Sequence, residues 1–284
     1  MKITIRGVHG SIPTSGPEIE HYGGNTSCTD VTAEGWRLVL DGGSGMRHSN
    51  TGDKPSNNRV DILLTHLHLD HIQGLGFFKP LFDPSMEVHI WGPASSKEPL
   101  NSRLRKYLSP PLFPVYIRDL PSKLTFHEID HSIFQIGPFT IYSQYVIHPG
   151  PTVGFRVRHK DTVFTYIPDH EPALGLNGIL PDHKWVSGID LALGADLLLH
   201  DAQYNVQEYK DKVGWGHSSM DDAALFASMA GVKRLLLAHH DPSHTDEQLN
   251  EMFADLKSRN NYSFRYELAA EGMEIELPPV AEYS

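Results

Sequence analysis

The sequence predicts an α+β fold, a four-layer αββα sandwich, from three observations. Short strand-like runs recur between residues 2 and 167, helical patterns gather in the second half, and polar residues end several apolar runs. Strands that bury one face need a second sheet to pack against, and helices then cover the outer faces. We expect residues 1–284 to form a single domain, because sandwiches commonly reach this size as one unit.

The expected strands are short runs that either alternate in polarity or are wholly apolar. They lie at 2–6, 27–32, 37–40, 61–64, 87–91, 123–128, 139–146, 153–158 and 162–167, and two further apolar runs cover 197–199 and 235–238. Helices are expected after His71, after Trp185, at 218–230 and at 245–257, while clustered prolines predict an irregular segment at 108–114.

Composition predicts an enzyme of the cytoplasm without a membrane segment. The chain has one cysteine, no apolar run of about eighteen residues and no apolar signal-peptide core at its start. Its formal net charge of −11 argues against a general nucleic-acid surface, since phosphate binding needs clustered Lys and Arg. An anionic small substrate stays compatible with this charge, because bound divalent ions would reverse it locally.

The strongest functional signal is a cluster of metal-ligand residues directly after the apolar run 62–64. His66, His68, Asp70 and His71 stand within six positions. Imidazole and carboxylate groups are the ligands of Zn²⁺ and similar divalent ions. Crowding four such groups together is costly without a cation between them, and the His-x-His spacing suits an extended loop. The segment therefore predicts a metal site with room for a second ion.

This His-x-His-x-Asp-His motif resembles the signature of the metallo-β-lactamase superfamily, which implies the αββα sandwich with the metal site at one of its edges. The resemblance implies three further ligands in order, and His148, Asp169 and His239 each follow a strand-like run. One ion would be bound by His66, His68 and His148. The other would be bound by Asp70, His71 and His239, with Asp169 bridging the two. Zn²⁺ is the first choice, and Mn²⁺ or iron the alternatives.

Three further segments resemble the tRNase Z and related phosphodiesterase branch of this superfamily. They are His148-Pro149-Gly150 followed by Gly154-Phe155-Arg156, the segment His200-Asp201-Ala202-Gln203, and the segment Gly216-His217-Ser218-Ser219. The resemblance implies that His217, paired with Asp201, transfers a proton to the leaving oxygen. Asp70 is expected to serve catalysis as well as to bind metal. Asp169 replaces the Cys of the β-lactamases proper, which argues against antibiotic hydrolysis.

The predicted function is hydrolysis of a small phosphodiester, such as a cyclic nucleotide, by a hydroxide that bridges two metal ions. A polymeric nucleic acid is the weaker expectation, because only residues 152–168 separate His148 from Asp169. The tRNA-processing enzymes commonly insert a Gly- and Lys-rich arm there. Two alternatives stay open: a lactone, ester or thioester hydrolase on the same metals, and a tRNA 3′-end endonuclease. A metal-sensing or partner-binding module that kept the fold is a nonenzymatic hypothesis.

Several roles are left open by the sequence. His240, His170, Glu171 and the loop Gly23–Ser27 could contact substrate or support the ligands, and Asp41 is a candidate partner for a metal-binding His. His9 is expected in solvent. The apolar and aromatic segment 110–116 suits either a wall for stacking a base or a contact within a homodimer.

Overall fold

In the computed structural model, which describes residues 1–51, 55–173 and 175–278, two mixed sheets face each other. The first sheet has the order β14-β1-β2-β3-β4-β5-β6 in the described residues. Its strands are β1 (Lys2–Gly7), β2 (Cys28–Ala33), β3 (Trp36–Leu40), β4 (Arg59–Leu63), β5 (Glu87–Pro93), β6 (Lys123–Ile129) and β14 (Glu274–Glu276).

The second sheet is built from the later part of the chain, in the order β13-β12-β11-β10-β9-β8-β7. Its strands are β7 (Ser132–Ile136), β8 (Phe139–Tyr145), β9 (Val153–His159), β10 (Thr162–Ile167), β11 (Leu197–Asp201), β12 (Arg234–Ala238) and β13 (Arg265–Leu268). Strands β10 to β13 run parallel to one another, so their carboxyl ends lie at the same edge of the sheet.

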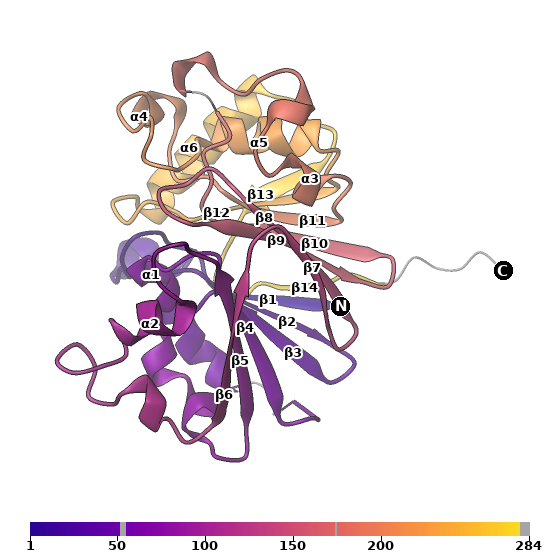
Figure 1. Cartoon of the computed structure of the whole chain (residues 1–284). Coiled ribbons are helices and arrows are strands. Elements are labelled where there is room, and N and C mark those ends of the chain that lie inside the picture. Colours follow the sequence, from indigo (N-terminus) through magenta and orange to yellow (C-terminus); the bar gives the residue numbers. More distant parts are fainter. Residues whose placement is uncertain (52–54, 174, 279–284) are drawn as a thin grey trace.

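Helices cover the outer face of each sheet, which gives the four layers (Figure 1). Helices α1 (Leu69–Ile72) and α2 (Leu100–Arg105) lie with the first sheet. Helices α3 (Ile189–Ala192), α4 (Val206–Lys210), α5 (Met220–Met229) and α6 (Asp246–Arg259) lie with the second. The predicted α+β sandwich is thereby confirmed.

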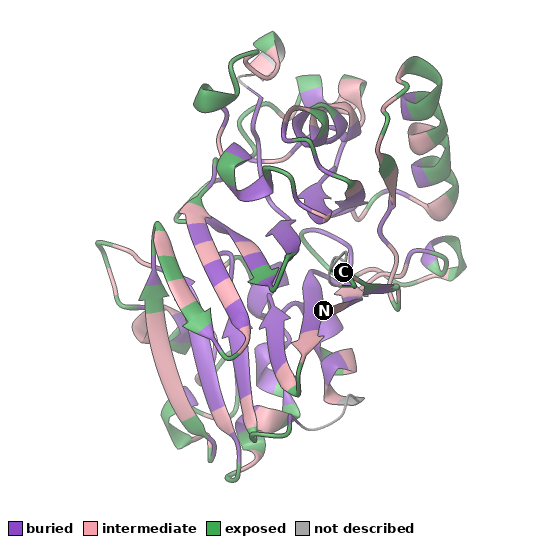
Figure 2. Cartoon of the chain, turned by 90° about the vertical axis from the view of Figure 1, so that its right-hand side faces the viewer, coloured by how far each residue is buried: buried purple, intermediate pink, exposed green. Residues whose placement is uncertain are grey.

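Three apolar cores correspond to the three interfaces between these layers, and the buried residues run through the inner strands (Figure 2). The central core joins the sheets through residues such as Ile5, Leu40, Phe155 and Leu236. A second core packs the first sheet against α1, α2 and neighbouring loops, and a third packs the second sheet against α3, α5 and α6. The wholly buried strand β10 has apolar neighbours on both of its faces, as expected of a strand covered on both sides.

The strands expected from the sequence are all present, with ends displaced by one or two residues. One expectation was wrong in position: helix α1 begins at Leu69 and contains His71, whereas a helix was predicted to follow that residue. After α1 the chain forms only short 3₁₀ turns at Leu75–Phe77 and Lys79–Phe82. The segment 108–114 is irregular, as predicted. Across the described residues, every helix is too short or too polar to cross a membrane.

Candidate metal centre and active site

The predicted site residues meet at one edge of the sandwich, and all of them except His217 lie at the end of a strand or in the segment that follows one. Asp169 follows β10, Asp201 ends β11 and His239 follows β12, and these three strands are parallel neighbours. His66 follows β4 of the other sheet, and His148 follows β8. The site therefore lies where the ends of both sheets converge, which is how a rigid scaffold presents side chains to a loop surface.

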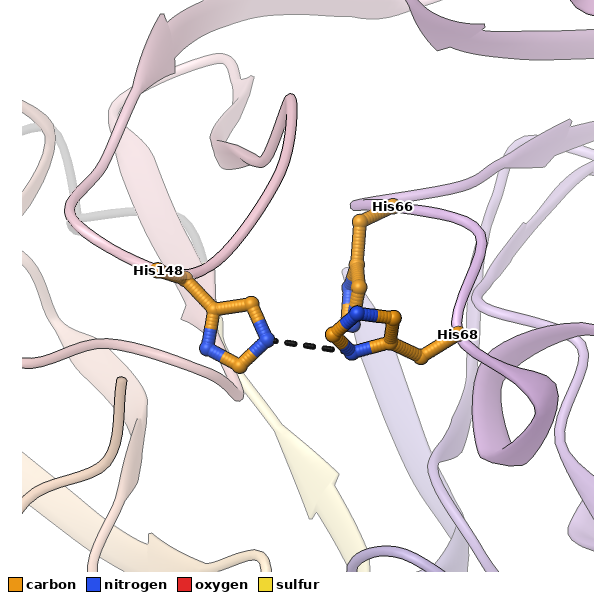
Figure 3. Close-up of side chains that lie close together, drawn as sticks. All are labelled: His66, His68 and His148. Atoms are coloured by element: carbon orange, nitrogen blue, oxygen red, sulfur yellow. Dashed lines mark hydrogen bonds between the residues drawn. The ribbon is translucent and has the colours of Figure 1, made fainter. Parts of the chain in front are cut away.

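The first group of candidate ligands consists of His66, His68 and His148, whose ligand atoms lie within 4.8 Å of one another. Figure 3 shows that His148 approaches from its own loop, opposite the loop that carries the other two. The Nε2 of His148 lies 3.2 Å from Nδ1 of His68, and the dashed line in Figure 3 joins them. Three imidazoles converging from two loops are a ligand set that could hold a metal ion.

The second group consists of Asp70, His71, Asp169 and His239, all buried and again within 4.8 Å. Asp169 stands between the two groups. Its Oδ2 lies 3.0 Å from His71 Nε2 and its Oδ1 lies 3.2 Å from His239 Nε2. The same Oδ1 lies 3.9 Å from His66 Nε2 and 3.8 Å from His148 Nε2, so this carboxylate is placed to bridge two ions.

In three of the site histidines Nδ1 has a hydrogen-bond partner, which leaves Nε2 of each ring for a metal. Nδ1 of His71 donates to Asp41 Oδ2 at 2.8 Å, and Nδ1 of His66 lies 3.0 Å from the Thr65 hydroxyl. Nδ1 of His239 lies 3.3 Å from the Ser27 hydroxyl. Such bonds fix the ring and its tautomer in metal sites. Asp41 is thus a partner of a site histidine, as the sequence suggested.

The residues present fit a metal ion. Among the described side chains, His66 Nε2, His71 Nε2 and Asp169 Oδ2 are buried without a hydrogen bond of good geometry, although the last two atoms lie 3.0 Å apart and attract each other when His71 is protonated. Buried polar atoms are nearly always well partnered, and a cation among these three would satisfy them all, His66 Nε2 included.

In the metal-free protein, the surroundings favour the neutral form of some candidate ligands and the charged form of others. Burial lowers the pKa of His66 well below its usual value, and burial likewise lowers that of His239. Burial also acts on His71, but Asp169, Asp70 and Asp41 outweigh it and raise the pKa of His71 well above its usual value. Burial opposes the ionised form of Asp169, yet the surrounding histidines hold its pKa well below the ordinary range.

His217 lies beside the two groups and is held by Asp201. Its Nδ1 lies 2.7 Å from Oδ2 of the buried Asp201, and 3.9 Å from Asp169 Oδ1. Burial disfavours the charged imidazole, but the carboxylate of Asp201 outweighs this effect and raises the pKa of His217 to about 9. His148, Asp169 and His217 also form a third group with metal-ligand spacing. The pair has the geometry of an acid oriented by a carboxylate.

Comparison with known proteins agrees with this geometry, since residues 37–240 match the family described as Beta-lactamase superfamily domain. The chain belongs to the beta-lactamase superfamily. Ribonuclease Z of Streptococcus gordonii is 30% identical to it over 266 residues, which cover 76% of this chain and 83% of that relative. The chain is therefore a member of a family of metal-dependent hydrolases.

Two solved structures share the beta-lactamase superfamily fold of this chain. The metallo-beta-lactamase fold protein YhfI from Bacillus subtilis superposes with a TM-score of 0.70 at 19% identity, covering 96% of this chain and 98% of its own. Human tRNase Z, short form, superposes with a TM-score of 0.68 at 22% identity, covering 98% of this chain and 100% of its own. At these identities the likeness concerns the fold.

Glu171, whose role the sequence left open between supporting the ligands and contacting substrate, lies beside the candidate site of this superfamily member and supports its loops. This buried carboxylate accepts hydrogen bonds from the backbone N–H of Gly214 at 2.8 Å and of Gly216 at 2.7 Å, and from the Tyr209 hydroxyl at 2.9 Å. It thereby fixes the loop that carries His217. No local pattern announced this role, because its partners are backbone groups more than forty residues away in the sequence.

The histidines with open roles lie inside the molecule. His170 and His240 are both 0% exposed, and His240 Nε2 donates to the carbonyl of Ala269 at 3.0 Å. His170 Nδ1 lies 3.0 Å from His200 Nε2. His9 is buried as well, so the expectation of a solvent position was wrong. In the loop Gly23–Ser27, Ser27 reaches the His239 ring, which gives that loop a supporting role.

Proposed function

We propose that this chain is a metal-dependent phosphodiesterase, and the position of His217 carries the proposal. The His217–Asp201 pair lies at the edge of two ligand groups that share Asp169. A phosphodiester has a poor alkoxide leaving group, which gains from a proton delivered by a positioned acid, typically by about 10²–10⁴-fold in rate. A lactone or thioester has less need of this dedicated pair.

The assigned ligands are His66, His68 and His148 for one ion, Asp70, His71 and His239 for the other, and Asp169 for both. Two divalent ions, Zn²⁺ first and Mn²⁺ or iron as alternatives, would neutralise phosphate charge and supply an activated water. Asp201 accepts from Nδ1 of His217, which would leave Nε2 of this ring for the leaving oxygen of the substrate. The loop that carries His217 is held by the hydrogen bond from the Gly216 N–H to Glu171, which would keep the His217 ring in position.

The identity of the phosphodiester has two candidates. The ribonuclease Z relatives favour an RNA 3′ end, the alternative kept in the sequence analysis, over the small phosphodiester that was its first choice. The hairpin of β9 and β10 favours a small phosphodiester. These strands are joined by residues 160–161 alone, which leaves no gripping arm between His148 and Asp169.

The test uses protein stripped of metal and reloaded separately with Zn²⁺ or Mn²⁺. Bis(p-nitrophenyl) phosphate, 3′,5′-cyclic AMP and a tRNA precursor with a 3′ extension are offered in parallel. We expect metal-restored hydrolysis of the first, and its loss in Asp169→Ala. Cleavage of the precursor or of the cyclic nucleotide then chooses between the two candidates. No rate on any ester with both metals bound would overturn the proposal.

A variant of His217 separates phosphodiester cleavage from the lactonase alternative. His217→Ala should lower the rate on alkyl phosphodiesters by about 10²–10⁴-fold, with no matching loss on lactones. An equal loss on both classes would mean that His217 supports the metals and does not act as an acid.

A further inference from the structure

The loop of residues 8–11, directly after β1, contacts the second group of candidate ligands. The backbone N–H of Ser11 donates to Asp70 Oδ2 at 2.8 Å. This carboxylate oxygen is the one turned toward the other ligand atoms of the group, since it lies 3.2 Å from His71 Nε2 and 3.8 Å from His239 Nε2. The loop therefore holds Asp70 by the oxygen that would bind an ion.

Gly10 packs directly on the His239 ring. A Cβ at this position would lie 2.5 Å from both Cδ2 and Nε2 of His239, and 3.0 Å from Nε2 of the Gln203 amide. The φ of Gly10 lies outside the left-handed region, so close approach is what requires glycine here. A side chain at position 10 would have to displace the edge of the His239 ring that carries Nε2, the nitrogen left for a metal.

Hydrogen bonds that need no metal hold this loop in place. The N–H of Gly10 donates to the carbonyl of His240 at 3.0 Å, and the N–H of His240 donates to the carbonyl of Val8 at 2.9 Å. Ser11 has a left-handed backbone with φ of 62°, which a non-glycine residue adopts only where its surroundings hold it. The end of β1 is thus tied to the segment after β12, and the loop has its position before an ion binds.

The contacts of the loop are confined to one of the two ligand groups. Among the hydrogen bonds of the described residues, none joins residues 8–11 to the three histidines of the first group. Those histidines are supported elsewhere, since the Thr65 hydroxyl lies beside Nδ1 of His66, and the Gly216 carbonyl accepts from Nδ1 of His148. A change in the loop therefore reaches the second group directly, while the first group keeps its own support.

We infer that Gly10 and Ser11 are positioning residues for the ion assigned to Asp70, His71 and His239, and that their loop determines how firmly this ion alone is bound. The inference rests on the ligand assignment of the proposed function and deepens it. A protein with a disturbed loop would hold one ion where the intact protein holds two, and the shared Asp169 would then serve a single ion.

The first test compares Gly10→Ala with the unchanged protein. Both are stripped of metal, titrated with Zn²⁺ by calorimetry, and analysed for metal content after dialysis against graded chelator. We expect two ions per chain in the unchanged protein. In Gly10→Ala one ion should bind about 10–100-fold more weakly, with the affinity for the other unchanged. Gly76→Ala is the matched control, because a Cβ there would lie 2.5 Å from the ring of Phe113, which belongs to neither ligand group, and both ions should be retained.

Two further measurements keep the test decisive if Gly10→Ala does not fold. Ser11→Gly keeps the backbone N–H and suits a positive φ, so this variant should retain both ions. In an NMR titration of the unchanged protein with Zn²⁺, the amide signal of Ser11 should respond to only one of the two equivalents, because its N–H contacts only one ligand group.

Several results would overturn the inference. They are full affinity for both ions in Gly10→Ala, equal weakening of both ions, loss of an ion in Ser11→Gly, and a Ser11 amide signal that responds equally to both equivalents. An unchanged protein that binds a single ion would overturn it as well. Failure of the proposed function is distinguishable from these results: two ions bound without hydrolysis of any ester would refute the phosphodiesterase and leave the inference standing.

Discussion

At the scale of single residues, Asp41 contacts one candidate ligand group directly, through His71, and the other indirectly, through Thr65 beside His66. It accepts from His71 Nδ1 at 2.8 Å and from the Thr65 N–H at 2.7 Å, and the Thr65 hydroxyl lies in turn beside His66. Asp41 also has a left-handed backbone, with φ of 58° just beyond β3, which a non-glycine residue adopts only where its surroundings hold it. One carboxylate therefore orients a histidine in each group.

We predict that Asp41→Asn lowers metal affinity or activity by about 10–100-fold, because an amide is a weaker acceptor for the His71 ring. Metal content after dialysis against graded chelator gives the affinity, and hydrolysis of bis(p-nitrophenyl) phosphate gives the activity. Asp30→Asn is the matched control, since Asp30 is a buried carboxylate that pairs with Arg37 away from the ligands. An Asp41→Asn protein that keeps full metal affinity would contradict the role assigned to this residue.

The charge of His71 predicts how metal binding depends on pH. Its pKa is raised well above the usual value in the metal-free protein by Asp169, Asp70 and Asp41, which favours the protonated imidazole. A metal must displace that proton, because only neutral imidazole binds. Apparent affinity should therefore rise as pH increases toward the pKa of His71, and binding should release protons. Calorimetry at pH 7 in buffers of different ionisation enthalpy measures the release. A heat that is independent of the buffer would contradict this assignment.

At the scale of elements, the loop between α4 and α5 positions His217 through its backbone. Gly216 has φ of +90°, and its carbonyl accepts from His148 Nδ1 at 2.8 Å while its N–H donates to Glu171. A Cβ at this position would lie 2.5 Å from His148 Nδ1 and would also overlap Pro149. The glycine is thus required by both its conformation and its close approach.

We predict that Gly216→Ala lowers kcat on alkyl phosphodiesters by at least tenfold, because it displaces His148 and His217 together. Gly214→Ala is a matched control: it also has positive φ, of +84°, but a Cβ there meets nothing within 4 Å. Both variants place an alanine in a positive-φ conformation, but only Gly216→Ala brings a Cβ into overlap with His148 and Pro149. The difference in activity between them therefore measures the effect of this overlap. Equal activities of the two variants would show that close approach at Gly216 is unimportant.

The sequence predicted elements well where local pattern and structure coincide. Strand β10 is an unbroken buried run, and α6 begins at Asp246 after the N-cap Thr245, with a capping box that the sequence carries in four residues. Three strands were missed. β13 and β14 are short and depend on distant partners, since β14 pairs with β1 at the opposite end of the chain, whereas β7 forms a local hairpin with β8. The candidate ligands stood out because strand ends are locally visible. Glu171 was noticed beside Asp169, but its role stayed open because its partners come together only in the folded chain.

At the scale of the whole molecule, the candidate ligands join the two halves of the sandwich. His66, His68, Asp70 and His71 follow the first sheet, whereas His148, Asp169 and His239 belong to the second. Without a metal, several buried polar atoms at this junction have no partner, and a lost hydrogen bond of this kind costs about 1–3 kcal/mol. Metal binding to the native state should therefore stabilise the fold as well as create the site.

Metal removal is accordingly predicted to lower the thermal midpoint of unfolding. A ligand at a hundred times its dissociation constant stabilises the native state by about 2.7 kcal/mol, which is worth roughly 4–5 °C in a chain of this size. Differential scanning calorimetry of chelator-treated and Zn²⁺-reloaded protein measures the shift. His148→Ala removes one candidate ligand of the first group, so the shift of the midpoint should shrink in this variant. Ile133→Ala changes an exposed residue of β7 outside the candidate site and should preserve the shift in full. An unchanged midpoint in protein shown by metal analysis to hold two ions would mean that the ions do not link the sheets, and that the apolar core between them supplies this stability alone.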